Sequence, residues 1–431
     1  MRIDFEYGRQ GLAVDLPDER LRAVLRLNPM PPLADQEGGV AAALRTPLGC
    51  QPLAELARGR RDACIVICDI TRPVPNQRIL PSLIATLEEA GIPSERITIL
   101  IATGNHRPNE GDELVEMIGA DIAARYRVVN HHSEVDEEQA YLGESRHGVG
   151  IYVDRTYVDA DLKIITGLIE PHFMAGYSGG RKIVCPGLIS LKTVHYFHSP
   201  ALLEDERATN GVLSGNPLHE FALEVCERAG VDFSVNVVID ENRDICGVFA
   251  GALEPAHAAG VAFCDQVCRV EVDEPAEVVV TSSAGYPLDT TFYQAVKGMV
   301  GALPALKPGG TVIIAAELSE GIGSEEFSRL LFAAPDHESF MADILDPGFV
   351  FTKDQWEVEM LCRVLRRGQV MVVSDKVPAE VLNKCLVTAM PSVEAAVAAA
   401  LARHGERAGI IAIPSGPYCI PTPRQPVGAG G

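Results

Sequence analysis

The chain has 431 residues, of which 47% are apolar, so it is long enough for two domains that each bury a core. Its 59 acidic residues outnumber 37 basic ones, and the resulting formal charge of −22 argues against binding to nucleic acid or to an anionic membrane. No uninterrupted apolar run of about 18 residues occurs, and no export signal opens the chain, so we expect a cytoplasmic protein with no membrane partner. The eleven cysteines are an odd number, which favours reduced thiols.

Strand-like and helix-like segments alternate along the first half of the chain, which is typical of an α/β fold. The predicted strands are 63–68, 97–102, 161–166 and 233–239. The predicted helices are 78–90, 111–119, 216–229 and 251–268.

The second half repeats this alternation after an acidic, proline-marked stretch at 270–275, which we interpret as a linker. The predicted strands are 277–281, 311–315, 370–373 and 410–413, and the predicted helices are 290–304, 325–333 and 393–404. Ser392 is the expected N-cap of the last helix, and Glu394 in its first turn complements the helix dipole.

We therefore predict two α/β domains with mixed or parallel sheets, comprising residues 1–270 and 276–431. The strand at 410–413 could complete the second sheet or return with the tail to the first domain. An active-site cleft between the two domains is expected, because the polar motifs described below occur in both.

Polar motifs directly follow two of the predicted strands. Asp69, Thr71 and Arg72 come after the apolar run 63–68, and His106 comes after 97–101. Open α/β sheets bind their ligands at the carboxyl ends of strands, so these side chains are candidates for a common site.

The run from Glu170 to Lys182, followed by His198, is the richest in chemistry. Histidine is the commonest protein metal ligand and a general acid or base, and lysine is the usual covalent handle for a carbonyl-like group. The run supplies these groups within a glycine-rich loop: His172, Ser178, Gly179, Gly180, Arg181 and Lys182.

Together with Tyr293, Gln294, Lys297 and the single tryptophan Trp356, these segments resemble the lactate racemase family. The matching segments extend from near residue 69 to near residue 356. Members of this family use a nickel-pincer nucleotide, a pyridinium mononucleotide whose two sulfur arms hold nickel. The resemblance implies attachment of this cofactor through Lys182 and a nickel ligand at His198, with His195 as the rival imidazole.

The resemblance also implies that His106 and His172 are the paired acid/base groups. Arg72 and Lys297 are then expected to hold the substrate carboxylate, with Gln294 and Tyr293 at the border of the substrate or of the pyridinium ring. Asp69 could orient Arg72 or a catalytic imidazole, and Trp356 could pack over the pocket. Ser178, Gly179, Gly180 and Arg181 are candidates for binding the cofactor phosphate, and Thr71 is a weaker one.

The resulting hypothesis is a racemase or epimerase of a small anionic 2-hydroxy acid, acting by hydride transfer through a 2-keto acid. Proteins that synthesise the cofactor are implied partners. One alternative is a nicotinamide-dependent dehydrogenase, but no G-x-G-x-x-G loop is present between a strand and a helix. Another is a non-catalytic nickel- or nucleotide-binding protein, which the two histidines argue against. The sequence leaves the particular hydroxy acid open.

Overall fold

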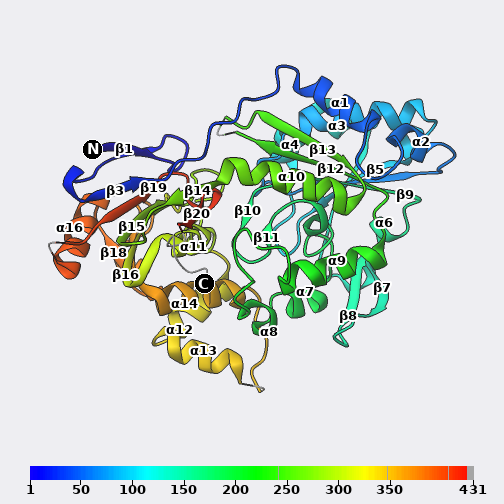
Figure 1. Cartoon of the computed structure of the whole chain (residues 1–431). Coiled ribbons are helices and arrows are strands. Elements are labelled where there is room, and N and C mark those ends of the chain that lie inside the picture. Colours follow the sequence, from blue (N-terminus) through cyan, green and yellow to red (C-terminus); the bar gives the residue numbers. More distant parts are fainter. Residues whose placement is uncertain (241, 347, 406, 425–431) are drawn as a thin grey trace, which may run out of the picture. The chain divides into compact units, whose positions relative to one another are not determined.

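The computed structural model describes residues 1–240, 242–346, 348–405 and 407–424, and the chain divides into two compact units. Unit 1 combines residues 1–28 with the chain from Val267 onward, and unit 2 is Pro29–Gln266. Each unit contains one six-stranded sheet with helices around it, which confirms the predicted α/β class (Figure 1). None of the described helices is long and apolar enough to cross a bilayer.

The sheet of unit 2 carries the strands that the first half of the sequence predicts. Five of its strands run parallel, and β13 at one edge is antiparallel to β12. In spatial order the strands are β13 (Ile245–Gly251), β12 (Phe233–Ile239), β9 (Leu162–Leu168), β4 (Ala63–Cys68), β5 (Ile97–Ala102) and β6 (Arg127–Asn130). All six residues of β4 are buried, as expected of a central strand covered on both faces.

Helices and small hairpins complete unit 2. Its α-helices are α1 (Gln36–Arg45), α2 (Leu53–Ala57), α3 (Asn76–Glu89), α4 (Gly111–Ile118), α5 (Ala120–Arg125), α6 (Arg155–Val158), α7 (Leu191–Phe197), α8 (Pro200–Leu203), α9 (Pro217–Ala229) and α10 (Leu253–Cys268). The hairpins pair β7 (Gln139–Glu144) with β8 (Gly150–Asp154) and β10 (Pro171–His172) with β11 (Gly176–Tyr177). Short 3₁₀ turns are η2 (Ser94–Arg96), η3 (Asp136–Glu138) and η4 (Gly180–Ile183).

The sheet of unit 1 is parallel throughout. Its strands in spatial order are β18 (Thr388–Met390), β17 (Gly368–Val373), β16 (Leu306–Ala315), β15 (Ala276–Ser282), β19 (Ile410–Ile413) and β3 (Leu21–Val24). The strand at 410–413 therefore completes the second sheet, which decides between the two courses left open by the sequence.

The helices of unit 1 are α11 (Phe292–Gly301), α12 (Glu325–Ala333), α13 (His337–Leu345), α14 (Gln355–Arg367), α15 (Ala379–Leu382) and α16 (Val393–His404). Its 3₁₀ turns are η1 (Asp18–Arg20), η5 (Leu303–Ala305) and η6 (Gly416–Tyr418). Helix α16 begins where the sequence predicts, because the Ser392 side chain accepts a hydrogen bond from the backbone N–H of Ala395.

The first 28 residues belong with unit 1, whereas the sequence analysis grouped them with the N-terminal domain. Two strands, β1 (Arg2–Phe5) and β2 (Leu12–Asp15), form a hairpin whose apolar side chains enter the core between the sheet and α16. Strand β3 then pairs with β19. The supposed linker is also structured, since β14 (Arg269–Val272) pairs in parallel with β20 (Ile420–Pro423).

Candidate active site

Three neighbouring parallel strands of unit 2 end at the same edge of the sheet. Asp69 follows β4, His106 follows β5, and Glu170 and His172 follow β9. Since β4 lies between β5 and β9, residues that are about 100 positions apart along the chain are brought to one place, as expected for a site at the carboxyl edge of a sheet.

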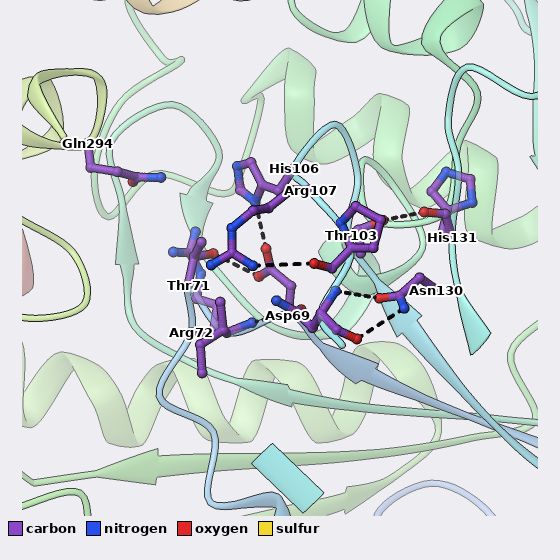
Figure 2. Close-up of polar contacts among 12 residues, drawn as sticks. Asp69, Thr71, Arg72, Thr103, His106, Arg107, Asn130, His131 and Gln294 are labelled. Atoms are coloured by element: carbon purple, nitrogen blue, oxygen red, sulfur yellow. Dashed lines mark hydrogen bonds and ion pairs between the residues drawn. The ribbon is translucent and has the colours of Figure 1, made fainter. Parts of the chain in front are cut away.

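The carboxylate of Asp69 binds the imidazole of His106. Oδ2 of Asp69 lies 2.6 Å from Nδ1 of His106, and the Thr71 hydroxyl donates to Oδ1 at 2.7 Å (Figure 2). Burial raises the pKa of Asp69, but the charge and hydrogen bond of His106, the Thr71 hydroxyl and the charge of Arg72 outweigh it, so the pKa is lowered from its ordinary value. An ionised carboxylate only accepts hydrogen bonds, so Nδ1 of His106 carries a proton, and in the neutral ring Nε2 presents a lone pair.

His172 is held in the opposite tautomer. Its Nδ1 accepts hydrogen bonds from the backbone N–H groups of Met174 and Ala175, both at 3.2 Å, and its ring stacks on Phe173. An Nδ1 that accepts cannot carry a proton, so in the neutral ring Nε2 is the donor. The two predicted acid/base histidines therefore differ: His106 offers a lone pair at Nε2, and His172 offers a proton there.

Arg72 forms an ion pair with Glu170, and its charge also lowers the pKa of Asp69. Nε of Arg72 lies 3.0 Å from Oε1 of Glu170, and both side chains are largely buried. This ion pair joins the end of β4 to the end of β9 and fixes the direction of the guanidinium. Glu170 was not among the residues predicted from the sequence, although its place shortly after the buried strand β9 is a signal for a site residue.

Hydrogen bonds from neighbouring amide and hydroxyl side chains hold the loops after β4 and β5 in place. The Asn109 side chain accepts from the backbone N–H of Ile70 at 3.3 Å, and Asn109 in turn exchanges two hydrogen bonds with Asn130. The Thr103 hydroxyl donates to the carbonyl of His131 at 2.6 Å (Figure 2). The segments that carry Asp69 and His106 are thus tied to the end of β6.

The glycines of the loop after β11 are required by packing. Gly179 and Gly180 have φ of 73° and 51°, and a Cβ on Gly180 would lie 2.7 Å from the ring of His257. The backbone N–H of Gly180 donates to Oδ1 of Asn236 at 2.8 Å. Ser178, in the same loop, has a buried hydroxyl oxygen with no hydrogen-bond partner.

Arg181, expected to neutralise a phosphate, is 1% exposed and points into unit 2. Its guanidinium donates to the carbonyl of Ala175 at 2.6 Å and lies 3.0 Å from Nε2 of His257. Burial lowers the pKa of Arg181 to about 9. In this structure its hydrogen bonds brace the loop between His172 and Lys182.

Lys182 and His198 face a common region of unit 2. Nζ of Lys182 lies 5.9 Å from the ring centroid of Phe197, the residue before His198. Burial lowers the pKa of His198 well below its usual range, and the charges of Lys182 and His106 lower it further. A neutral imidazole is the form that binds metals. His195 is only half-buried, and burial alone lowers its pKa.

The four remaining candidates form a cluster on α11 and α14 of unit 1. Indole Nε1 of Trp356 donates to the hydroxyl of Tyr293 at 2.9 Å, and Nζ of Lys297 donates to Oε1 of Gln294. The Thr291 hydroxyl caps α11 by accepting from the backbone N–H of Gln294. The side chains of Gln294, Lys297 and Trp356 are all less than 10% exposed.

Within the described residues, no group of three or more His, Cys, Asp and Glu side chains could hold a metal ion. His198 is a chemically suitable protein ligand, Lys182 a nucleophilic amine nearby, and Ser178 a buried hydroxyl able to bind an oxyanion.

Comparisons with known proteins agree on one family. Residues 7–211 match the lactate racemase N-terminal domain, and residues 272–420 match the lactate racemase C-terminal domain. The chain is 37% identical over 389 residues to the lactate racemase of Thermoanaerobacterium thermosaccharolyticum, covering 90% of this chain and 91% of that one. It is 35% identical over 418 residues to the lactate racemase of Lactiplantibacillus plantarum, covering 96% and 98% respectively.

Solved structures give the same result for the fold. The lactate racemase apoprotein from T. thermosaccharolyticum superposes with a TM-score of 0.92 at 36% identity, covering 98% of this chain and 100% of that chain. A protein from Thermotoga maritima shares the fold at a TM-score of 0.71 and 19% identity, covering 92% of this chain and 100% of that chain.

Proposed function

Because the chain belongs to the lactate racemase family and is an isomerase, we propose that it interconverts the two enantiomers of lactate or a close 2-hydroxy acid through a 2-keto acid. The observation that carries the proposal is the pair of histidines at one sheet edge, fixed in opposite tautomers by Asp69 and by two backbone N–H groups.

Oxidation of a hydroxy acid requires removal of the hydroxyl proton. Nε2 of His106 is the base, and the ionised Asp69 stabilises the imidazolium that forms. Nε2–H of His172 donates a hydrogen bond to the substrate oxygen and stabilises the negative charge on it as the proton leaves.

The opposite enantiomer presents its hydroxyl from the other side. For His172 to act as the base there, its ring must turn over or Nδ1 must give up both backbone hydrogen bonds. We therefore expect the two directions to rely on His106 and His172 unequally. The equilibrium constant between two enantiomers is one, so kcat/KM must be equal in both directions. The two directions can therefore differ only in kcat and in KM taken separately.

The substrate carboxylate needs a local cation in a protein of formal charge −22. Arg72, oriented by Glu170, supplies a planar fork that suits a carboxylate. Lys297, with Gln294 as its hydrogen-bond partner, supplies a second cation. Tyr293 and Trp356 hold the Lys297 helix in place through their mutual hydrogen bond.

The residues present fit the nickel-pincer nucleotide of the family. Lys182 is the point of covalent attachment, His198 the protein ligand to nickel, and the buried Ser178 hydroxyl a partner for the nucleotide phosphate. When bound, this cofactor supplies the acceptor and donor of the α-hydride. Asp69 and Thr71 act on His106, and Gly179, Gly180 and Arg181 shape the loop that carries Lys182.

The path of the α-hydrogen tests the proposal. Protein made with the cofactor-synthesis proteins is given single enantiomers of lactate and other 2-hydroxy acids, and the products are separated by chiral chromatography. With α-deuterated substrate in ordinary water, the inverted product should keep its deuterium and form more slowly than from protiated substrate. Substantial exchange of the α-hydrogen with water would reject hydride transfer, and turnover that depends on added nicotinamide would indicate a dehydrogenase instead.

A further inference from the structure

A buried carboxyl group, that of Glu357, lies in the unit 1 cluster beside the proposed substrate-binding lysine. Glu357 is 1% exposed and stands in the first turn of α14, next to Trp356. Its Oε1 atom is buried and has no hydrogen-bond partner. A carboxyl oxygen in that position is costly unless a charge nearby compensates for the lost water.

Helix packing brings Lys297 to this carboxyl. Tyr293 and Lys297 are four residues apart on α11 and lie on the same face of the helix. Trp356 binds the hydroxyl of Tyr293, so that face of α11 meets the first turn of α14, where Glu357 follows Trp356. Electrostatic effects between these groups agree with this arrangement. The charge of Glu357 raises the pKa of Tyr293, and the charge of Lys297 lowers the pKa of Glu357.

We propose that Glu357 is a positioning residue for Lys297: its carboxyl lies beside the buried ammonium group, and its negative charge, when ionised, holds the proton on Lys297. The inference rests on the proposed role of Lys297 in substrate binding. An ammonium group buried without an anion nearby gives up its proton readily, and would then bind a carboxylate poorly.

Burial raises the pKa of Glu357 to about 8, the charge of Lys297 opposes the rise, and the charge of Asp354 adds to it. A carboxyl that titrates close to neutral pH can take up a proton when another anion replaces it beside Lys297. With a pKa of about 8 the carboxyl is the counter-charge of Lys297 in the alkaline range, and near neutral pH it is mostly protonated and leaves the ammonium group to the substrate carboxylate.

Other elements packed against α11 and α14 bring further titratable groups. On the side of α11 these are Glu277 of β15, Lys307 of β16 and Tyr418 of η6, and Glu277 is bonded to Lys307 and Arg22. On the side of α14 they are half-buried or exposed residues of α12 and α13: Glu325, Glu326, Arg329, His337, Glu338 and Asp343. The charge of Asp354 also raises the pKa of Glu357, and Oδ2 of Asp354 accepts a hydrogen bond from the Ser324 hydroxyl at 2.6 Å.

The test measures the pH dependence of trace acetylation of Lys297 in the apoprotein, read by peptide mass spectrometry. Since only the neutral amine reacts, the profile reports the pKa of Lys297. In Glu357→Gln the half-maximal pH should fall by about one unit or more, whereas Glu357→Asp, which keeps the charge, should resemble the unmodified protein. The exposed Lys384 provides an internal reference in every sample.

Glu359→Gln is the matched control. Glu359 is also fully buried in α14, but two residues further along an α-helix the side chain points to the opposite side. In the Glu359→Gln variant the pH dependence of Lys297 acetylation should be unchanged. An unchanged Lys297 profile in Glu357→Gln would overturn the proposal.

A reciprocal measurement covers the case in which Glu357→Gln does not fold. In Lys297→Met, carbodiimide labelling of Glu357, which requires the protonated acid, should persist to higher pH than in the unmodified protein. Labelling of Glu357 at the same pH in both would also overturn the proposal. Neither experiment uses cofactor or substrate, so their failure leaves the racemase proposal standing, and failure of racemisation leaves their result standing.

Discussion

Nδ1 of His106 lies 2.6 Å from Oδ2 of Asp69, and this contact joins the ends of two adjacent parallel strands. A second His–Asp pair in unit 2 has nearly the same geometry: Nδ1 of His131 lies 2.9 Å from Oδ2 of Asp154. The pairs differ at the far side of the ring. Nε2 of His131 lies 3.1 Å from the carbonyl of Ile189 and is enclosed, whereas the His106 side chain is 39% exposed.

Asp69→Asn should keep the shape of the site but remove the charge that stabilises a protonated His106. We expect kcat/KM for racemisation to fall on the order of 100-fold or more, with little change in melting temperature. Asp154→Asn is the matched comparison, and should lower the melting temperature while kcat per folded molecule stays near normal. Similar losses of activity in both variants would mean that Asp69 acts only through stability.

Arg72→Lys keeps the positive charge but loses the planar fork held by Glu170. Activity should fall by well over tenfold, since a hydrogen bond to a charged group contributes about 1.5–3 kcal/mol. Most of the loss should appear in KM for the hydroxy acid. Steady-state kinetics close to normal would instead make Arg72 a structural partner of Glu170.

Lys182→Ala should abolish the covalent mass increment of the cofactor while the protein still folds, because the lysine is a partly exposed loop residue. Intact-mass spectrometry is the measurement, and a retained increment would exclude Lys182 as the point of attachment.

His198→Ala should keep the organic part of the cofactor and lose most of the nickel, as read by metal analysis. His195→Ala is its matched control, three residues earlier in the same segment, and should retain the metal. Loss of nickel from the control but not from His198→Ala would show that the other imidazole is the ligand.

Glu277 offers a test of pH-dependent stability remote from the site. Burial raises its pKa, but the backbone N–H of Gly409 and the cations Lys307 and Arg22 lower it from an ordinary 4.5 to about 2. A carboxylate with a depressed pKa stabilises the fold above its unfolded-state pKa, and the stabilisation disappears as pH falls through the folded-state value.

Glu277→Gln should therefore lower the free energy of unfolding by about 1–2 kcal/mol near pH 7, after allowance for solvent screening at a partly exposed group. The difference should shrink between roughly pH 4.5 and pH 2. Denaturant titrations across this range measure it, and a difference that does not depend on pH would contradict the assignment.

The sequence alone determined the main strands of both sheets and the edge at which the polar residues after β4, β5 and β9 lie. Short apolar runs rich in β-branched residues, such as 63–68 and 97–102, favour buried strands of a parallel sheet, and their bounds are confirmed. Polar residues placed directly after such strands must then gather at one edge, so Asp69, His106 and His172 could be expected together.

Tertiary structure alone decided which of these groups pair. Asp69 could have bonded Arg72 or an imidazole, and the choice of His106 depends on the register of β4 against β5. Arg181 turned inward because the loop folds over His257, and residues 1–28 joined unit 1 because β3 found its partner in β19, nearly the whole chain away. Pairings of this kind depend on contacts between segments remote in sequence, and no local pattern of residues specifies them.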